Sequence, residues 1–180
     1  MRKLVESTFV TTDGVIGQPE KWSARYWDSE HSEYAAGLLF AADALLLGRE
    51  TYEHFARAWP SRPAGDEYTD RINSMPKYVA SRTLRQESGD WNATVLRGDI
   101  ATAVRALKSQ DGGDLLKFGT GSLSQTLLDA KLVDEYHLWV VPAVAGSGAR
   151  LFEGRDLTHL QLLGTTTFKS GIVVHRLAPS

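Results

Sequence analysis

Hydrophobic and polar residues alternate along this chain in two periods, one typical of strands and one typical of helices. Residues 3–12 are rich in β-branched and aromatic side chains and stop at Asp13-Gly14, which predicts a first strand. Residues 29–42 carry apolar side chains three and four positions apart, which predicts a helix with one buried face. Residues 44–47 form a continuous apolar run, as in strands that are covered on both sides.

The same alternation of strands and helices continues to the end of the chain. Further helices are predicted at 50–59, 100–107 and 122–128, with a short one inside the polar segment 61–75, and further strands at 77–81, 94–96, 114–118 and 133–141. The last two strands, 160–168 and 172–177, predict an antiparallel hairpin. This order predicts one three-layer α/β/α domain over residues 1–180, with a mostly parallel mixed central sheet.

Composition narrows the class of protein. The 20 Lys and Arg residues are balanced by 22 Asp and Glu residues, so no excess positive charge is present to hold a nucleic acid. The absence of cysteine excludes disulfides and thiol catalysis, and the five histidines show no metal-ligand spacing, so we expect no metal. The longest apolar run, 35–47, contains Asp43 and is shorter than the ~20 residues of a membrane span. We expect a cytoplasmic protein that binds neither nucleic acid nor a membrane.

Three predicted strand ends carry residues that suit an anion. Because ligands of open α/β sheets bind at the carboxyl ends of strands, these segments are expected to meet at one crevice. Helix N-termini there offer N–H groups to a phosphate. The segments are Gly48-Arg49, Ser81-Arg82-Thr83 and Gly119-Thr120-Gly121-Ser122. Each alone is also compatible with an ordinary cap or turn, and Ser124 replaces the third glycine of a dinucleotide fingerprint, which disfavours a Rossmann dehydrogenase.

In this order the motifs resemble the dihydrofolate-reductase-like superfamily. The resemblance is strongest to stand-alone relatives of the reductase domain of the bifunctional riboflavin-biosynthesis deaminase-reductase, and it covers nearly the whole chain. It rests on residues 12–17 (Thr-Asp-Gly-Val-Ile-Gly), 47–53, 81–83, 118–123, 132–135 and 141–152. The resemblance implies a dihydrofolate-reductase-like fold, the cofactor NADPH, a role in riboflavin biosynthesis and a homodimer.

The resemblance also implies which residues bind the cofactor. They are Ile16 and Gly17 near the nicotinamide, Gly48, Arg49 and Thr51 at the pyrophosphate, Ser81, Arg82 and Thr83 at the 2′-phosphate, and Gly119, Thr120, Gly121, Ser122 and Leu123 in a second glycine turn. The chemistry agrees, since a guanidinium fits phosphate oxygens. A second cation, Arg82, stands between the hydroxyl residues Ser81 and Thr83 and favours NADPH over NADH. Arg97 is placed to assist in binding the 2′-phosphate.

A reductase must also provide a proton at the reacting group. In the folate-reducing branch an acidic residue on the first helix does this, but an ungapped count back from Gly48 places Ser32 at that position. This departure argues against dihydrofolate as the substrate. Asp28, His31 and Glu33 are the candidate catalytic residues, although charged residues at a helix start also serve simply to complement its dipole.

Two hypotheses follow. The first is an NADPH-dependent reductase of a pterin-like or aminopyrimidine heterocycle, in which Trp22, Trp27 or Trp59 walls the ring pocket and loop 146–150 meets a phosphate on the substrate. Core packing and an ordinary connection are the plainer interpretations of these features. The alternative hypothesis is a non-catalytic NADP(H)- or nucleotide-binding protein of the same fold, which is consistent with the missing acid.

Overall fold

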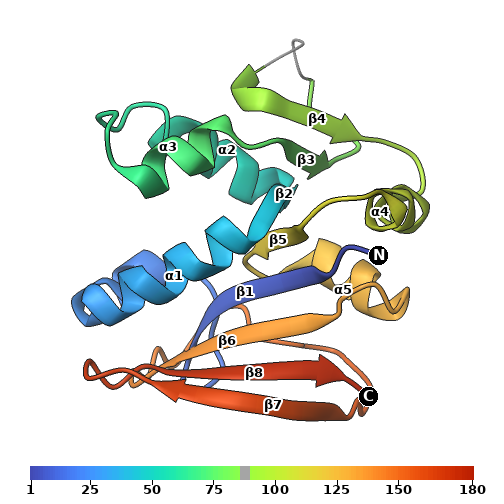
Figure 1. Cartoon of the computed structure of the whole chain (residues 1–180). Coiled ribbons are helices and arrows are strands. Elements are labelled where there is room, and N and C mark those ends of the chain that lie inside the picture. Colours follow the sequence, from blue (N-terminus) through green and yellow to red (C-terminus); the bar gives the residue numbers. More distant parts are fainter. Residues whose placement is uncertain (86–89) are drawn as a thin grey trace.

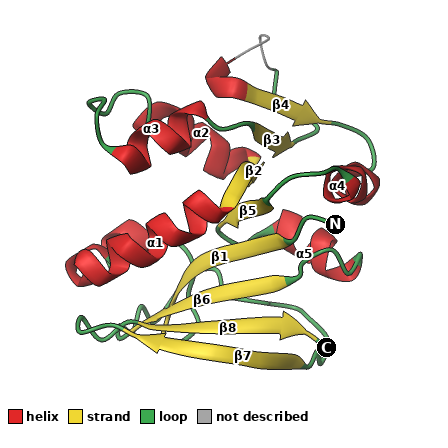
Figure 2. Ribbon diagram, viewed as in Figure 1, coloured by secondary structure: helices red, strands yellow, loops and turns green. Residues whose placement is uncertain are grey.

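The computed structural model describes residues 1–85 and 90–180, and its centre is an eight-stranded sheet (Figure 1, Figure 2). The strands are β1 (Leu4–Thr11), β2 (Ala42–Gly48), β3 (Lys77–Ala80), β4 (Ala93–Leu96), β5 (Asp114–Phe118), β6 (Glu135–Val141), β7 (Leu160–Thr167) and β8 (Val173–Pro179). Their order is β4-β3-β2-β5-β1-β6-β8-β7. The first six pair in parallel, whereas β8 is antiparallel to both β6 and β7. The predicted mixed sheet and C-terminal hairpin are therefore confirmed.

Helices cover both faces of this sheet. They are α1 (Ser29–Ala41), α2 (Arg49–Ala58), α3 (Glu67–Ser74), α4 (Ile100–Ser109) and α5 (Ser122–Asp129). The first three contribute to the hydrophobic cluster on one face, and α4 and α5 contribute to the cluster on the other. Three short 3₁₀ turns at Pro19–Lys21, Ala24–Tyr26 and Asp90–Asn92 were not predicted. No helix in the described residues is long and apolar enough to cross a membrane.

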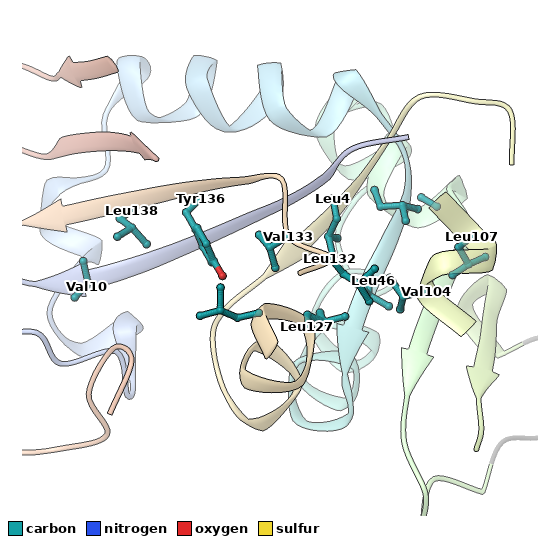
Figure 3. Close-up of a cluster of buried hydrophobic side chains, with 13 residues drawn as sticks. Leu4, Val10, Leu46, Val104, Leu107, Leu127, Leu132, Val133, Tyr136 and Leu138 are labelled. Carbon is teal, nitrogen blue, oxygen red and sulfur yellow. The ribbon is translucent and has the colours of Figure 1, made fainter. Parts of the chain in front are cut away.

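Alternation along the central strands divides the core between the two faces. In β2, Leu46 packs beneath α4 and α5 (Figure 3), whereas Leu45 and Leu47 pack beneath α1, α2 and α3. All three leucines are fully buried. Successive side chains of a strand point to opposite faces, so a strand covered on both sides must be apolar throughout. This explains the continuous apolar run in the sequence.

A third cluster packs α1 onto the strands near the hairpin. Trp139 of β6 lies at its centre and contacts Tyr34 of α1 and Phe168, with ring centroids 5.0 and 5.6 Å away. The Trp139 indole also donates to Ser7 Oγ of β1 at 2.9 Å. These contacts fix the N-terminal half of α1 against β1 and β6.

The carboxyl ends of the parallel strands lie at one side of the sheet. From there the chain enters helices on opposite faces after two neighbouring strands. After β2 it enters α2 on one face, and after β5 it enters α5 on the other. Because β2 and β5 are paired, this divergence makes the carboxyl ends of the two strands a topological switch point, the kind of place where open α/β sheets bind ligands. This edge is where the predicted anion-binding segments are located.

A chain of polar side chains links α1 to β6 and β8 on the side of the third cluster. The Tyr34 hydroxyl lies 2.8 Å from His137 Nδ1, and His137 Nε2 lies 2.9 Å from Glu135 Oε1. Arg176 donates to the same carboxylate oxygen at 2.8 Å. Since a carboxylate only accepts, the neutral ring carries its proton on Nε2 and accepts from Tyr34 at Nδ1.

We expect the stability of the protein to fall as the pH is lowered from about 8 to about 5. Burial lowers the pKa of His137 although Glu135 opposes the shift, so the folded protein keeps the ring neutral where the unfolded chain, with a pKa near 6.5, takes up a proton. The contribution of the neutral His137 ring to the free energy of unfolding is complete above the pKa of the unfolded chain. It is lost as the pH falls toward the pKa of this ring in the folded protein. Urea-unfolding midpoints measured across this range test the expectation.

The matched variants are His137→Gln, which removes the buried ring, and His159→Gln, which removes an exposed histidine. The pH dependence should be shallower in the first variant and unchanged in the second. An equal slope in wild type and His137→Gln would contradict the assignment.

Candidate functional site

Two helices begin at the carboxyl ends of the strands with a glycine, which has no side chain to accept from the first-turn N–H groups. The N-cap residues are Gly48 for α2 and Gly121 for α5, and within the described residues neither position has a side-chain cap hydrogen bond. By contrast, aspartate carboxylates cap α1, α3 and α4, at Asp28, Asp66 and Asp99. The first-turn N–H groups and positive dipole ends of α2 and α5 therefore remain available to an anion.

The glycine turn after β5 touches the first turn of α2. Gly119 has a φ of 71°, in the left-handed region that favours glycine. A Cβ built on it would lie 3.7 Å from Thr51 Oγ1, and its N–H donates to Ser7 O at 2.9 Å. The structure thus brings together two of the predicted cofactor segments, which are far apart in the sequence.

Arg49 connects the start of α2 to the third predicted segment. Its Nη1 donates to Thr83 Oγ1 at 2.6 Å, and its Nε donates to Glu53 at 2.7 Å. Ser81 Oγ accepts from Thr83 N at 3.2 Å and so folds this segment back on itself, while Arg82 is exposed. The guanidinium is about half exposed, so it can reach an anion while it keeps these bonds.

Arg97, the residue expected to assist, is tied to the same loop. Its Nη2 donates to Leu84 O at 3.0 Å, and the N–H of Leu84 donates to Ser81 Oγ at 2.9 Å. Arg97 thus lies beside the Ser81–Thr83 segment, as expected from its place after β4.

Ile16 and Gly17 lie in a loop that the segment after β6 holds in place. Ile16 N donates to Ala149 O at 2.9 Å. Asp13 accepts from the N–H groups of Ala145 and Gly146 at 3.0 and 2.8 Å. The Thr11 hydroxyl and these two N–H groups lower the pKa of Asp13 to about 2. The two loops therefore form one unit at the end of β1.

A small hollow joins this unit to the second glycine turn. Its lining includes Ile16, Thr120, Gly121, Arg150 and Phe152. The Thr120 hydroxyl is buried there and has no hydrogen-bond partner among the described residues. Two other residues of the predicted turn have surroundings different from those of Thr120 and Gly121. Ser122 is exposed at the first position of α5, and Leu123 packs against the core cluster.

Four aromatic rings form a shelf at the start of α1. The rings of Trp27 and His31 stack with centroids 5.2 Å apart and an interplanar angle of 5°. Phe9 and Trp139 lie 5.7 and 5.1 Å from the His31 ring. Trp27 is 50% exposed, which leaves one face of the shelf open to a flat ligand.

The shelf lies close to the glycine turn along β1. Phe9 is two residues beyond Ser7, whose carbonyl oxygen accepts from Gly119 N. Two residues span about 7 Å of an extended strand. The shelf and the glycine turn are therefore neighbours along β1.

The three candidate catalytic residues occupy different environments. Asp28 caps α1 by accepting from His31 N at 2.8 Å, and this bond lowers the pKa of the carboxyl. Glu33 and Ser32 are exposed. His31 alone of the three belongs to the shelf, where burial lowers its pKa against the opposing charge of Asp28. Its Nδ1 is buried and unpartnered within the described residues.

Of the three tryptophans considered for a ring pocket, only Trp27 belongs to the shelf. Trp22 donates to Gly17 O at 2.9 Å and packs against the third cluster. Trp59 packs against Tyr68 beside α3. Phe9 and Trp139 were not predicted for the site, because their approach to His31 depends on strand pairing rather than on local spacing.

Comparison with known proteins adds the family context. A family model described as the RibD C-terminal domain matches residues 2–174. The uncharacterized protein YyaP of Bacillus subtilis (strain 168) is 31% identical over 180 residues, covering 96% of this chain and 92% of that protein. The uncharacterized protein YwjB of the same organism is 28% identical over 178 residues, covering 97% of this chain and 97% of that protein.

Solved structures share the fold at low sequence identity. A putative riboflavin biosynthesis protein from Shewanella sp. PV-4 has a TM-score of 0.76 at 16% identity, with 99% of each chain covered. A pyrimidine reductase-like protein from Corynebacterium diphtheriae has a TM-score of 0.69 at 14% identity, covering 99% of this chain and 92% of that one. A Thermotoga maritima diaminohydroxyphosphoribosylaminopyrimidine deaminase/5-amino-6-(5-phosphoribosylamino)uracil reductase has a TM-score of 0.69 at 15% identity, covering 99% of this chain but 57% of that one. Because the family model spans nearly the entire chain, this protein belongs to the RibD C-terminal domain family.

Proposed function

We propose that this protein is an NADPH-dependent reductase that transfers hydride to a pterin-like or aminopyrimidine heterocycle of the riboflavin-precursor type. The observation that carries the proposal is that α2 and α5 begin at glycines, Gly48 and Gly121, beside the carboxyl ends of the paired strands β2 and β5. Thr51 lies beside the Gly119 turn there, and Arg49 donates to Thr83. Membership of the RibD C-terminal domain family supports a reductase-like function.

The residues at the crevice suit a dinucleotide with three phosphates. Arg49, Thr51 and the N–H groups at the start of α2 would hold the pyrophosphate, together with the Gly119 turn. Ser81, Arg82 and Thr83 would hold the 2′-phosphate, and Ile16 and Gly17 would border the nicotinamide. When bound, the nicotinamide supplies hydride to the acceptor carbon.

The aromatic shelf is the proposed place of the substrate ring. Trp27 offers an exposed face of the size of a pyrimidine or pterin, and the shelf continues inward through His31 to Trp139. The pyrimidine reductase-like and uracil reductase names of two structural neighbours favour the same substrate class. Arg150 lines the hollow beside Gly121 and would meet a phosphate on the substrate.

His31 is the proposed proton donor, because it lies within the shelf while Glu33 is exposed. Hydride addition to a ring carbon leaves a neighbouring nitrogen that must take up a proton. Asp28 fixes the backbone of His31 at the first turn of α1 and is therefore proposed to position it rather than to react.

The proposal also includes a cytoplasmic location, as the composition led us to expect, and a homodimer, as the family resemblance implies. Edge strand β7 and the segment before it support the second point. Leu157, Leu162 and Leu163 are 88%, 57% and 42% exposed there, and exposed leucines on an edge strand favour association.

Incubation with NADPH and a panel of oxidised pterins and aminopyrimidine ribosides, with and without a 5′-phosphate, tests the activity. We expect oxidation of NADPH, measured as loss of its near-ultraviolet absorbance, with at least one member of the panel. Tight binding of NADPH without oxidation would favour the non-catalytic alternative. Failure of the wild-type protein to bind NADPH would refute both.

The proposed 2′-phosphate site is tested by Arg82→Ala. A charge-assisted bond of this kind is worth enough for about a tenfold or larger rise in the dissociation constant of NADPH. The affinity for NADH, which lacks the 2′-phosphate, should hardly change. Arg85→Ala removes another exposed arginine from the same loop and serves as the control. Equal weakening of both cofactors by Arg82→Ala would show that the phosphate binds elsewhere.

The role of His31 is tested by His31→Ala, measured in the same assay. A lost proton donor typically lowers the rate by about 10²–10⁴-fold, and the control His54→Ala, on the exposed side of α2, should not. Because a donor must be protonated and burial lowers this pKa, wild-type kcat/KM should rise as the pH falls toward the folded pKa. A loss of rate in Glu33→Gln but not in His31→Ala would assign the proton to Glu33 instead.

A further inference from the structure

A buried pair of charged side chains lies beneath the second glycine turn. Glu6 of β1 and Lys117 of β5 are opposite each other in the parallel register, and they are 0% and 2% exposed. Lys117 Nζ lies 3.4 Å from Glu6 Oε2. The two side chains share the face covered by α5, where Leu46 is paired with Lys117 and Tyr136 is paired with Glu6. Charges in such a place require a reason, because removing them from water is costly.

The ion pair itself does not provide that reason. Within the described residues no group makes a full hydrogen bond to the Glu6 oxygens, although the Ser124 hydroxyl and the Lys117 ammonium lie close enough to oppose the rise of the Glu6 pKa. The 3.4 Å distance to Lys117 is long for a charge-assisted bond. Burial raises the pKa of Glu6 and lowers the pKa of Lys117, and each group only partly opposes the shift of the other. The environment therefore disfavours both charges.

The closer contacts of Lys117 are all with the glycine turn. Its ammonium group donates to the carbonyl oxygen of Gly119 and, at 2.7 Å, to Ser124 Oγ. Ser124 Oγ also accepts from Gly121 N at 3.2 Å. Lys117 therefore holds both ends of the turn, with Ser124 as the intermediate at the start of α5.

The direction of these bonds matters for an anion. The left-handed conformation of Gly119 and the ammonium beneath it hold the Gly119 carbonyl oxygen toward the interior. A carbonyl oxygen at the crevice would repel a phosphate. The first intrahelical bond of α5 is donated by Gln125 to Gly121 O at 3.2 Å, so the N–H groups before Gln125 precede the helical ladder.

We propose that Lys117 is a positioning residue for cofactor binding, which orients the Gly119–Ser124 segment toward the anion, with Glu6 as its buried counter-charge. This inference rests on the proposed function, since it assigns the turn to the dinucleotide. It adds two residues, located inside β1 and β5, to the machinery of the site.

The test compares Glu6→Gln with the double variant Glu6→Gln/Lys117→Met. Both lack the carboxylate, so neither leaves an unpaired buried anion. Glu6→Gln keeps the lysine donors but leaves the ammonium without its counter-charge, whereas the double variant removes both charges. Dissociation constants are measured for NADPH and for adenosine 2′-monophosphate, which carries the 2′-phosphate but neither phosphate of the pyrophosphate. We expect the double variant to bind NADPH about tenfold or more weakly than Glu6→Gln, with the affinity for the monophosphate little changed.

A second measurement does not depend on any ligand. Amide hydrogen exchange of the free protein should become faster at residues 119–124 in the double variant than in Glu6→Gln, with exchange in α4 unchanged. Equal exchange in the two proteins, equal NADPH affinity, or a parallel loss of affinity for adenosine 2′-monophosphate would overturn the inference. If the wild-type protein does not bind NADPH, the proposed function fails, and the exchange comparison still decides whether Lys117 orders the turn.

Discussion

The position of β5 between β2 and β1 is the constraint on which the site depends. Through its pairing with β2, the turn at Gly119 reaches Thr51 at the start of α2. Through its pairing with β1, the same turn is bound to Ser7, two residues before the aromatic ring of Phe9. A proposed cofactor crevice and a proposed substrate shelf are therefore adjacent because one short strand lies between their two supporting strands. No contact between the loops themselves is needed to bring them together.

The fold was largely predictable from the sequence, because the central strands leave little ambiguity. Residues 44–47 lie within β2, and the strand and helix ends differ from the predicted ones by one or two residues. The start of α5 shows the limit of local signals. Ser122 followed by Gln125 has the spacing of a capping box, but the N-cap is Gly121, and Ser124 accepts from its N–H instead. A side chain drawn toward a buried lysine is a tertiary effect that spacing cannot show.

That the predicted anion-binding segments lie near one another was foreseeable for a similar reason, since each follows a strand that ends at the same side of the sheet. The aromatic shelf proposed for the substrate was not foreseeable. Trp27 and His31 are four residues apart at the start of α1, a spacing visible in the sequence, but Phe9 and Trp139 join them only because β1 and β6 are paired in register. Glu6 and Lys117 were missed for a stronger reason. A single charge inside an apolar strand suggests an exposed edge, and only the register of β1 with β5 brings the two together.

The structure also shows what the Ser32 side chain does in α1. Ser32 is exposed and donates to Asp28 O at 3.0 Å, so its side chain serves the first turn of α1. The preceding residue, His31, is the one that enters the aromatic cluster. A change of one position on a helix rotates a side chain by about 100°. In this chain the group at the shelf is therefore an imidazole rather than a carboxyl, and burial lowers its pKa.

Two features at the carboxyl edge lower stability, and they occur where the proposed site needs them. An aspartate N-cap stabilises a helix by about 0.5–2 kcal/mol relative to alanine but by only a few tenths of a kcal/mol relative to glycine. The glycine starts of α2 and α5 therefore cost little, while the other three α-helices among the described residues carry aspartate caps. A buried ion pair can often be replaced by apolar side chains at no loss of stability. A methionine at position 117 would fill the volume of the lysine but would leave Gly119 O and Ser124 Oγ without their donor. Folding alone explains neither feature. The glycine starts leave N–H groups available at the proposed crevice, and the buried pair is proposed to direct N–H groups toward it. That coincidence is what a binding site for an anion would require of the scaffold.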